Sequence, residues 1–233
     1  MAFVFTALLS VVAPATAASA PALELRAGDR VVLIGDALIE REQQAGWIEL
    51  MLTSRFPDRD ITFRNLGWGG DTPAGDSRFG LSLLQAGREP ADEGWNQLVK
   101  QIEEAKPTVV FIGYGMASSF AGESGLGQFK ADYGKLLNVI RRVSPEARVV
   151  LLPPIPHENL GAPWPNPEVH NAQLALYGRA VAEVAANNGA QFIPLFDQLR
   201  NHRGAPLTSN GIHLTNEGYR VAAEVLEEIG RAH

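Results

Sequence analysis

The sequence contains no cysteine, and this absence removes several kinds of chemistry at once. Without thiols the protein forms no disulfide bonds, has no thiolate nucleophile and binds no metal through cysteine. A chain of 233 residues can bury a substantial core without crosslinks. The lack of disulfides is therefore compatible with an oxidising compartment as well as with a reducing one.

Basic residues are few and scattered. The chain has 20 Lys and Arg against 26 Asp and Glu, a net charge of -6, and no dense basic run. Sequence-independent binding to nucleic acid requires a concentrated positive surface. We therefore expect neither a nucleic-acid partner nor a polybasic membrane patch.

Long apolar runs are missing too. Residues 3–12 are apolar but too few to span a bilayer, and residues 13–20 are small, as at a signal-peptidase site. We predict a signal peptide over residues 1–17, or up to Ala20, although cleavage there would place Pro21 beside the scissile bond. This predicts an exported protein, periplasmic or extracellular, without a membrane span. The alternative is an apolar tail that is not removed.

Over the rest of the chain, apolar runs of strand length alternate with helical periodicity. Such alternation implies right-handed crossovers and a mainly parallel sheet with helices on both faces. We predict a single domain over residues 23–232, a three-layer α/β/α sandwich with about five parallel strands. The predicted strands are 30–35, 61–66, 108–112, 148–152 and 191–194, the first and last helices are 47–56 and 216–229, and residues 73–93 form a surface excursion.

Glycine and polar residues gather in the loops where chemistry is expected. In open α/β sheets ligands bind beyond the carboxyl ends of the strands, where successive loops converge. The loops concerned are Gly35-Asp36-Ala37, 67–72, 113–119 and 209–215.

Together these loops resemble the conserved blocks of the SGNH or GDSL hydrolase superfamily, which includes esterases, lipases and carbohydrate deacetylases. The resemblance extends over about residues 30–229 and implies the flavodoxin-like SGNH hydrolase fold. Residues 65–72 resemble the glycine block, which would make the backbone N–H of Gly70 an oxyanion-hole donor. Residues 210–215 resemble the block that supplies the catalytic histidine, which would make His213 the base.

The departures from this pattern fall on the reacting groups. Ala37 stands where the family has its serine nucleophile, Ala117 where it has an oxyanion asparagine, and Asn210 where it has the aspartate that orients the histidine. The stretches 35–41 and 114–122 further resemble a divergent SGNH-like branch from exported proteins of environmental bacteria, in which the nucleophile block is commonly eroded. A methyl group cannot attack a carbonyl, so no acyl-enzyme can form at Ala37. Each of the other two losses typically lowers the rate by about 10²–10⁴-fold.

Other residues could replace the missing groups. Ser118 or Ser119 could act as a nucleophile, or His213 could activate water with help from Asp36 or Asp71. The structural alternatives are that each serine is a turn or cap residue and that Asp36 holds its own turn together.

Aromatic and histidine side chains near these loops suggest further contacts. Trp68 and Tyr114 could stack on a sugar or acyl group, or could simply pack their loops. His157 and His170 flank a proline-rich loop and either line the rim of the site or have no role. The histidines lack metal-ligand spacing, so we expect no metal, and nothing implies another cofactor.

The resemblance implies an esterase-type site for acylated carbohydrate or another small ester, with activity weakened or lost. The alternative is a non-catalytic module that binds a glycan or acyl ligand on the same fold. A nucleotide- or flavin-binding domain is disfavoured because no phosphate-cradling glycine motif follows the first strand. The sequence specifies neither the substrate nor the oligomeric state.

Overall fold

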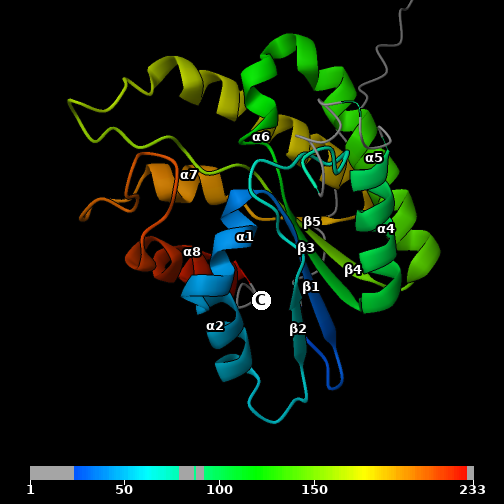
Figure 1. Cartoon of the computed structure of the whole chain (residues 1–233). Coiled ribbons are helices and arrows are strands. Elements are labelled where there is room, and N and C mark those ends of the chain that lie inside the picture. Colours follow the sequence, from blue (N-terminus) through cyan, green and yellow to red (C-terminus); the bar gives the residue numbers. More distant parts are fainter. Residues whose placement is uncertain (1–23, 79–86, 88–91, 230–233) are drawn as a thin grey trace, which may run out of the picture.

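The computed structural model describes residues 24–78, 87 and 92–229, and its centre is a sheet of five parallel strands (Figure 1). The spatial order is β2-β1-β3-β4-β5, the flavodoxin-like order that the resemblance implied. The predicted strands are confirmed to within two residues at each end, whereas the predicted signal peptide at 1–17 lies outside the described residues. The strands are β1 (Arg30–Gly35), β2 (Thr62–Asn65), β3 (Val109–Gly113), β4 (Arg148–Leu152) and β5 (Gln191–Phe192).

Helices cover both faces of the sheet, as Figure 1 shows. One face carries α1 (Ala37–Ala45), α2 (Trp47–Arg55), α7 (Leu195–Arg200) and α8 (Asn216–Ile229). The other carries α4 (Glu93–Ala105), α5 (Leu126–Val143) and α6 (Glu168–Asn188), and the short 3-10 turns η1 (Ser118–Ala121) and η2 (Glu123–Gly125) precede α5. Within the described residues, no helix is both long and apolar enough to cross a membrane.

Strand β1 explains how the sheet positions the loops. Val31 and Leu33 pack against the α1, α2, α7 and α8 side, whereas Val32 packs against the opposite layer. Because both faces are buried, the strand is a continuous apolar run rather than an alternating one. It ends at Gly35, whose partner in register is Gly113 at the end of β3. The two strands therefore finish side by side at one edge of the sheet.

The first helical region differs from the prediction. Helical periodicity in the sequence begins at Trp47, but the structure has an additional helix, α1, that meets α2 at Gly46. Gly46 has φ 69° and donates its N–H to the Glu42 carbonyl (2.7 Å), a left-handed cap that suits glycine. Helix α1 buries only Ile39 and Glu42, so it lacks the apolar stripe that reveals a helix in a sequence.

Glu42 is a buried carboxyl group that forms no ion pair with any described residue. Its Oε1 accepts the Ile48 N–H (2.6 Å), while Oε2 has no partner among the described residues. Burial raises the pKa of Glu42 from 4.5 to about 7. Since the folded pKa exceeds the unfolded one, the associated stability is complete below the unfolded pKa and is lost as the pH rises through about 7.

We predict that Glu42→Gln flattens the pH dependence of stability. The free energy of unfolding of the unmodified protein should fall by up to about 3 kcal/mol more than that of the variant between about pH 5 and pH 8. Urea unfolding at several pH values measures the difference. Glu104→Gln, at an exposed position in α4, is the matched control and should follow the unmodified protein. Parallel curves for Glu42→Gln and the unmodified protein would contradict the prediction.

Candidate active site

The loops after β1, β2 and β3 are joined by backbone hydrogen bonds at the carboxyl edge of the sheet. The Asp36 N–H donates to the Gly113 carbonyl (3.0 Å), and the Trp68 N–H donates to the Gly35 carbonyl (2.9 Å). These bonds link three of the loops that carry the predicted site residues.

The fourth loop reaches the same place through α8. An isolated antiparallel bridge between Thr208 and Leu214 closes the loop that carries His213. The Tyr219 hydroxyl of α8 donates to the Leu38 carbonyl of α1 (2.8 Å). The loop is thereby held beside the amino-terminal turn of α1.

Asp36 is the side chain that fixes the first turn. Its Oδ1 accepts the Leu38 N–H and caps α1, while Oδ2 accepts the Met116 N–H of the loop after β3, both at 3.2 Å. Burial raises the pKa of Asp36 to about 7; these N–H donors oppose the shift and the nearby Asp71 charge adds to it. Both carboxyl oxygens are engaged, so Asp36 serves the framework of the site.

Ala37 is the first residue of α1, and its side chain is half-buried. The first N–H groups of a helix lack intrahelical acceptors. Here Asp36 accepts from Leu38, Ile39 and Glu40 through its side chain and carbonyl. The Ala37 N–H has no acceptor among the described residues, so the helix start retains one free donor beside an inert methyl group.

The glycine loop after β2 lies directly against α1. A Cβ on Gly67 would lie 2.3 Å from the Glu40 nitrogen, so only glycine fits there. Gly70 has φ 75°, a left-handed conformation, and is exposed. Its N–H has no acceptor among the described residues, which leaves a second free backbone donor at this edge.

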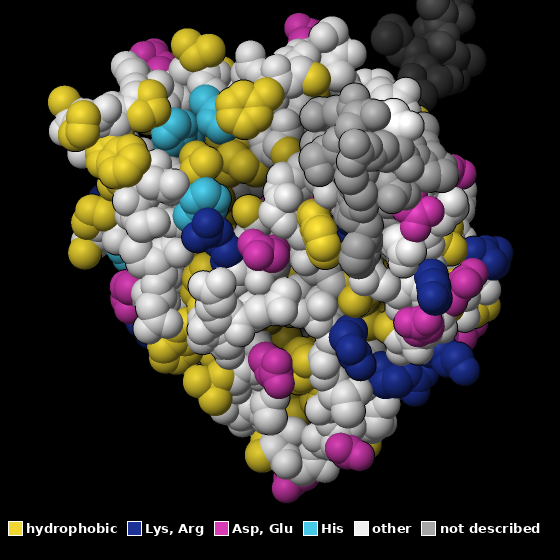
Figure 2. Space-filling model, in the orientation of Figure 1, with side chains coloured by type: hydrophobic (Ala, Val, Ile, Leu, Met, Phe, Trp, Pro, Cys, Tyr) yellow, Lys and Arg dark blue, Asp and Glu magenta, His cyan; other side chains and the backbone are white. Residues whose placement is uncertain are grey.

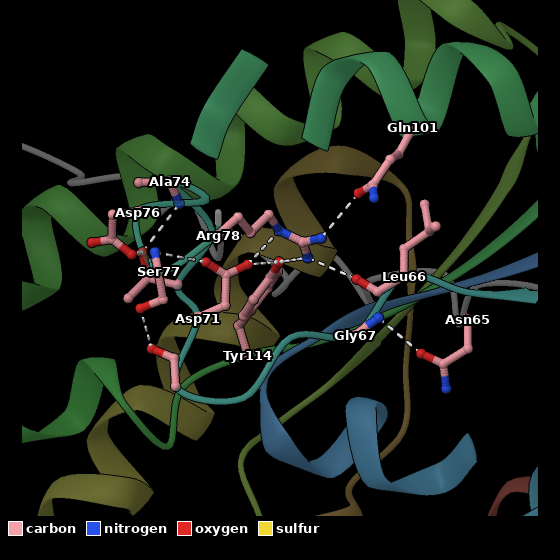
Figure 3. Close-up of polar contacts among 12 residues, drawn as sticks. Asn65, Leu66, Gly67, Asp71, Ala74, Asp76, Ser77, Arg78, Gln101 and Tyr114 are labelled. Carbon is pink, nitrogen blue, oxygen red and sulfur yellow. Dashed lines mark hydrogen bonds and ion pairs between the residues drawn. The ribbon is translucent and has the colours of Figure 1, made fainter. Parts of the chain in front are cut away.

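A buried ion pair supports this loop (Figure 3). The Arg78 Nε donates to Asp71 Oδ2 (2.7 Å), which also accepts the Tyr114 hydroxyl (3.0 Å). Arg78 also donates to the Leu66 carbonyl (2.7 Å) and to Gln101 of α4 (3.2 Å). Burial raises the pKa of Asp71, and the Arg78 guanidinium opposes the shift.

The structure of this loop changes three of the expectations from the sequence. Tyr114 was predicted to contact a ligand, but its ring is fully buried and its hydroxyl is used by Asp71. The predicted surface excursion at 73–93 is wrong at its start, because Pro73 and Arg78 are buried. Asp71 is likewise enclosed and paired, so it is not available to assist a water molecule in the crevice.

Asn210 determines which nitrogen of His213 carries the proton. The Asn210 Oδ1 accepts the backbone N–H groups of Ile212 (3.3 Å) and His213 (3.0 Å), which turns its Nδ2 toward His213 Nδ1 at 2.9 Å. An amide nitrogen only donates, so Nδ1 must accept and the neutral ring carries its proton on Nε2. An aspartate at this position would accept from Nδ1 and leave Nε2 as the basic atom.

The protonation of His213 is also set by its surroundings. Burial lowers the pKa of His213, the Arg41 guanidinium lowers it further, and the Glu40 carboxylate opposes them. The ring is therefore neutral near neutral pH. Its Nε2 has no hydrogen-bond partner among the described residues, so Nε2–H is a free donor.

Ser119 belongs to a chain of buried polar groups. Its hydroxyl donates to the Met116 carbonyl (2.7 Å), so it accepts from His170 Nε2 (3.0 Å). The His170 Nδ1 then accepts from His157 Nδ1–H at 3.1 Å. Ser119 is fully buried and held on both sides, whereas Ser118 is half-buried. The buried hydroxyl thus ties η1 to α6.

A cavity of about 620 Å³ lies beside Asn210. Three exposed hydrophobic side chains, Phe120, Trp164 and Val169, line it, and the Phe120 ring stacks on His170 with 4.5 Å between ring centroids. Figure 2 shows histidine side chains beside hydrophobic ones on the upper part of this face. The described lining contains no Asp, Glu, Lys or Arg; its other members are His157, Pro165, Asn166, Gln173 and Ile212.

Three further residues predicted for the site lie partly at the surface. Trp68, Ala117 and Ser118 are half-buried, and the Ala117 methyl offers no hydrogen-bond donor. Within the described ranges, no group of three or more potential ligands could hold a metal ion.

Sequence reasoning missed Glu40, Arg41 and the pairing of His157 with His170. Glu40 and Arg41 follow Ala37 at helical spacing, which would have revealed them had α1 been predicted. The histidine pair is separated by a proline-rich loop and has no local signal.

Comparisons with known proteins find a family whose model matches most of the chain. Residues 33–221 match the GDSL-like Lipase/Acylhydrolase family. A search of curated protein sequences gave no match.

Several solved structures are similar to the fold. Axe2, an acetylxylan esterase from Geobacillus stearothermophilus, has a TM-score of 0.63 at 18% identity, with 89% of this chain and 97% of that chain covered. TesA has a TM-score of 0.62 at 20% identity, with 85% and 96% covered. LAE5, an alpha/beta hydrolase enzyme from the metagenome of Lake Arreo in Spain, has a TM-score of 0.59 at 20% identity, with 89% and 97% covered. At these identities the likeness concerns the fold.

We predict that Arg78→Met lowers the free energy of unfolding by about 3–5 kcal/mol, because it leaves the buried Asp71 carboxylate unpaired. Urea denaturation followed by circular dichroism measures the change. Lys130→Met, which breaks the exposed pair with Glu183, is the control and should lower stability by less than about 1 kcal/mol. Equal effects of the two variants would mean that the buried network does not hold the glycine loop.

Proposed function

Since the chain belongs to the GDSL-like lipase/acylhydrolase family, we propose that its crevice takes acylated carbohydrates or other small esters but hydrolyses them weakly or not at all. The observation that carries the proposal is that the four loops meet at one edge of the sheet with Ala37 at the first position of α1. Gly70 and Ala37 offer backbone donors there, and His213 offers its imidazole. The framework of an esterase site is retained without its attacking hydroxyl.

The loss of the covalent route follows from the residue types. Ala37 has no nucleophilic atom, and the Ala117 methyl cannot donate a hydrogen bond to an oxyanion. Asn210 holds His213 with its proton on Nε2, so the ring could not remove a proton from a hydroxyl even if one were present. The residues at positions 37, 117 and 210 therefore each remove a group that the covalent route needs.

The structural neighbours support the substrate class. Axe2 is described as an acetylxylan esterase, and two of its structures are catalytic mutants, one at an aspartate and one at a histidine three positions later. Asn210 and His213 have the same spacing in this chain. We take acetylated oligosaccharides as the first substrates to test.

The cavity beside Asn210 favours the second candidate, a binding module. Its exposed aromatic rings could stack on a sugar or acyl group, and the amides of Gln173 and Asn210 could bind hydroxyl groups. The lining described above carries no permanent charge, which suits a neutral ligand. A short-ester assay separates the two: turnover that His213→Ala abolishes supports an enzyme, and ligand binding without turnover supports a module.

The proposal also includes the location of the protein in the cell. We propose export to the periplasm or the extracellular space, on the basis of the apolar stretch and small residues within 1–20. Expression of the full chain and sequencing of the mature amino terminus tests this; a mature protein that begins near residue 18 is expected.

We predict that restoring the missing groups restores esterase activity. The combined variant Ala37→Ser, Ala117→Asn and Asn210→Asp supplies a nucleophile, an oxyanion donor and an acceptor for His213 Nδ1–H. Its kcat/KM for 4-nitrophenyl acetate should exceed that of the unmodified protein by at least about 10³-fold. Adding His213→Ala should abolish the gain. A folded combined variant that stays silent on a broad ester panel would contradict the site assignment.

We predict that Phe120→Ala and Trp164→Ala each weaken binding of acetylated xylo-oligosaccharide by about tenfold, which corresponds to about 1.4 kcal/mol of lost stacking and apolar contact. Isothermal titration calorimetry measures the affinity. Leu50→Ala removes an exposed hydrophobic side chain from α2 and should leave binding unchanged. Because the described lining is uncharged, the affinity should also change little with salt; a steep salt dependence would contradict this site.

A further inference from the structure

Two charged side chains share the Ala37 side of α1. Residues three and four positions apart lie on one face of a helix, so Glu40 and Arg41 follow Ala37 on the same face. Both side chains are half-buried, whereas Ile39 and Glu42, on another side of the helix, are buried. The inert methyl group thus has a carboxylate and a guanidinium one turn beyond it.

The Glu40 carboxylate reaches over the glycine loop. Its Oε2 lies 3.6 Å from the point that a Cβ on Gly69 would occupy. The next residue, Gly70, is exposed and has a free backbone N–H. A carboxylate oxygen and a backbone donor therefore lie together at the crevice.

Glu40 also acts electrostatically on His213. The Glu40 carboxylate raises the pKa of His213, although burial and the Arg41 guanidinium together prevail. The Glu40 carboxylate and the Arg41 guanidinium therefore both lie close enough to act on the neutral His213 ring.

Glu40 differs from the other carboxyl groups near the crevice because it has no hydrogen-bond or ion-pair partner in the part of the chain that the structure describes. Among the described residues, the Glu40 side chain accepts no hydrogen bond and forms no ion pair. The Arg41 guanidinium likewise donates no hydrogen bond to any described residue. Asp36, Asp71, Glu42 and Glu158 each accept at least one hydrogen bond from a backbone N–H or a side chain. With respect to the described residues, Glu40 alone of these five keeps both oxygens free.

We propose that Glu40 is the general base of a direct, single-displacement ester hydrolysis in which water replaces the missing serine. This inference rests on the proposed function, namely ester binding in the crevice. The roles follow from the free atoms: His213 presents Nε2–H and can only donate, while Glu40 presents lone pairs and can accept a proton. The resemblance to the family would make His213 the base. Here Glu40 takes the role of base and His213 becomes a hydrogen-bond donor.

The reaction balances without another reagent. Glu40 removes a proton from water as the water oxygen bonds to the ester carbonyl carbon, and the carbonyl π electrons move to its oxygen. That oxyanion accepts hydrogen bonds from the Gly70 N–H and from His213 Nε2–H. Its collapse breaks the bond to the leaving alkoxide, which takes the proton from Glu40. One ester and one water give one acid and one alcohol, and Glu40 is ionised again.

The test measures hydrolysis of 4-nitrophenyl acetate and acetylated xylo-oligosaccharide by the purified protein at high enzyme concentration. We expect Glu40→Gln to lower kcat/KM by about 10²-fold or more, with unchanged circular dichroism. Glu104→Gln is the control and should retain full activity. Added formate should restore activity to Glu40→Ala in a concentration-dependent manner, because a small carboxylate can replace a missing base but cannot repair a structural defect. Intact-protein mass spectra during turnover should show no acetyl adduct.

Several results would overturn the inference. Activity of Glu40→Gln within twofold of the unmodified protein, or an acetyl adduct on any side chain, would exclude a Glu40-based direct displacement. Absence of turnover with calorimetrically measured ligand binding would also overturn it while leaving the proposed binding function intact. Absence of both binding and turnover would instead remove the proposed function itself.

Discussion

The geometry of the crevice depends on the two oxygens of one buried carboxyl group. Asp36 accepts the Leu38 N–H at the start of α1 with one oxygen and the Met116 N–H of the neighbouring loop with the other. Its position fixes where the helix begins relative to β3, and Ala37 follows directly. The framework is therefore held by Asp36 and does not require a particular side chain at 37. A nucleophile can be lost there while the surrounding loops keep their places.

The fold could be predicted from the sequence because its strands are apolar on both faces and are separated by helical periodicity. The strand order followed from the family resemblance and is confirmed. Helix α1 was missed because it has almost no apolar stripe, and the short α7 (Leu195–Arg200) was missed beside the two-residue strand β5. The burial of Arg78 could not be predicted, because an arginine in an aperiodic segment gives no sign of an ion pair with Asp71.

Only part of the site could be predicted from the sequence. The family resemblance singled out the loops around Ala37, Gly70 and His213, and the structure describes all three loops. The consequences of Asn210 required geometry: the amide orientation follows from two backbone donors to its oxygen, and that orientation places the imidazole proton. The free carboxylate of Glu40 likewise emerged only when the partners of the other acidic residues were known.

His157 and His170, which line the cavity, lie so close together that only one hydrogen atom fits between their Nδ1 atoms. Their Nδ1 atoms lie 3.1 Å apart, and burial lowers the pKa of both rings, so at neutral pH one ring donates and the other accepts. Protonation of both rings would place an N–H on each Nδ1 and set the two N–H bonds against each other. Acidification would then push apart α6, which carries His170, and the segment after β4, which carries His157. Acidity in the surroundings would thereby alter the shape of the hollow that adjoins the crevice.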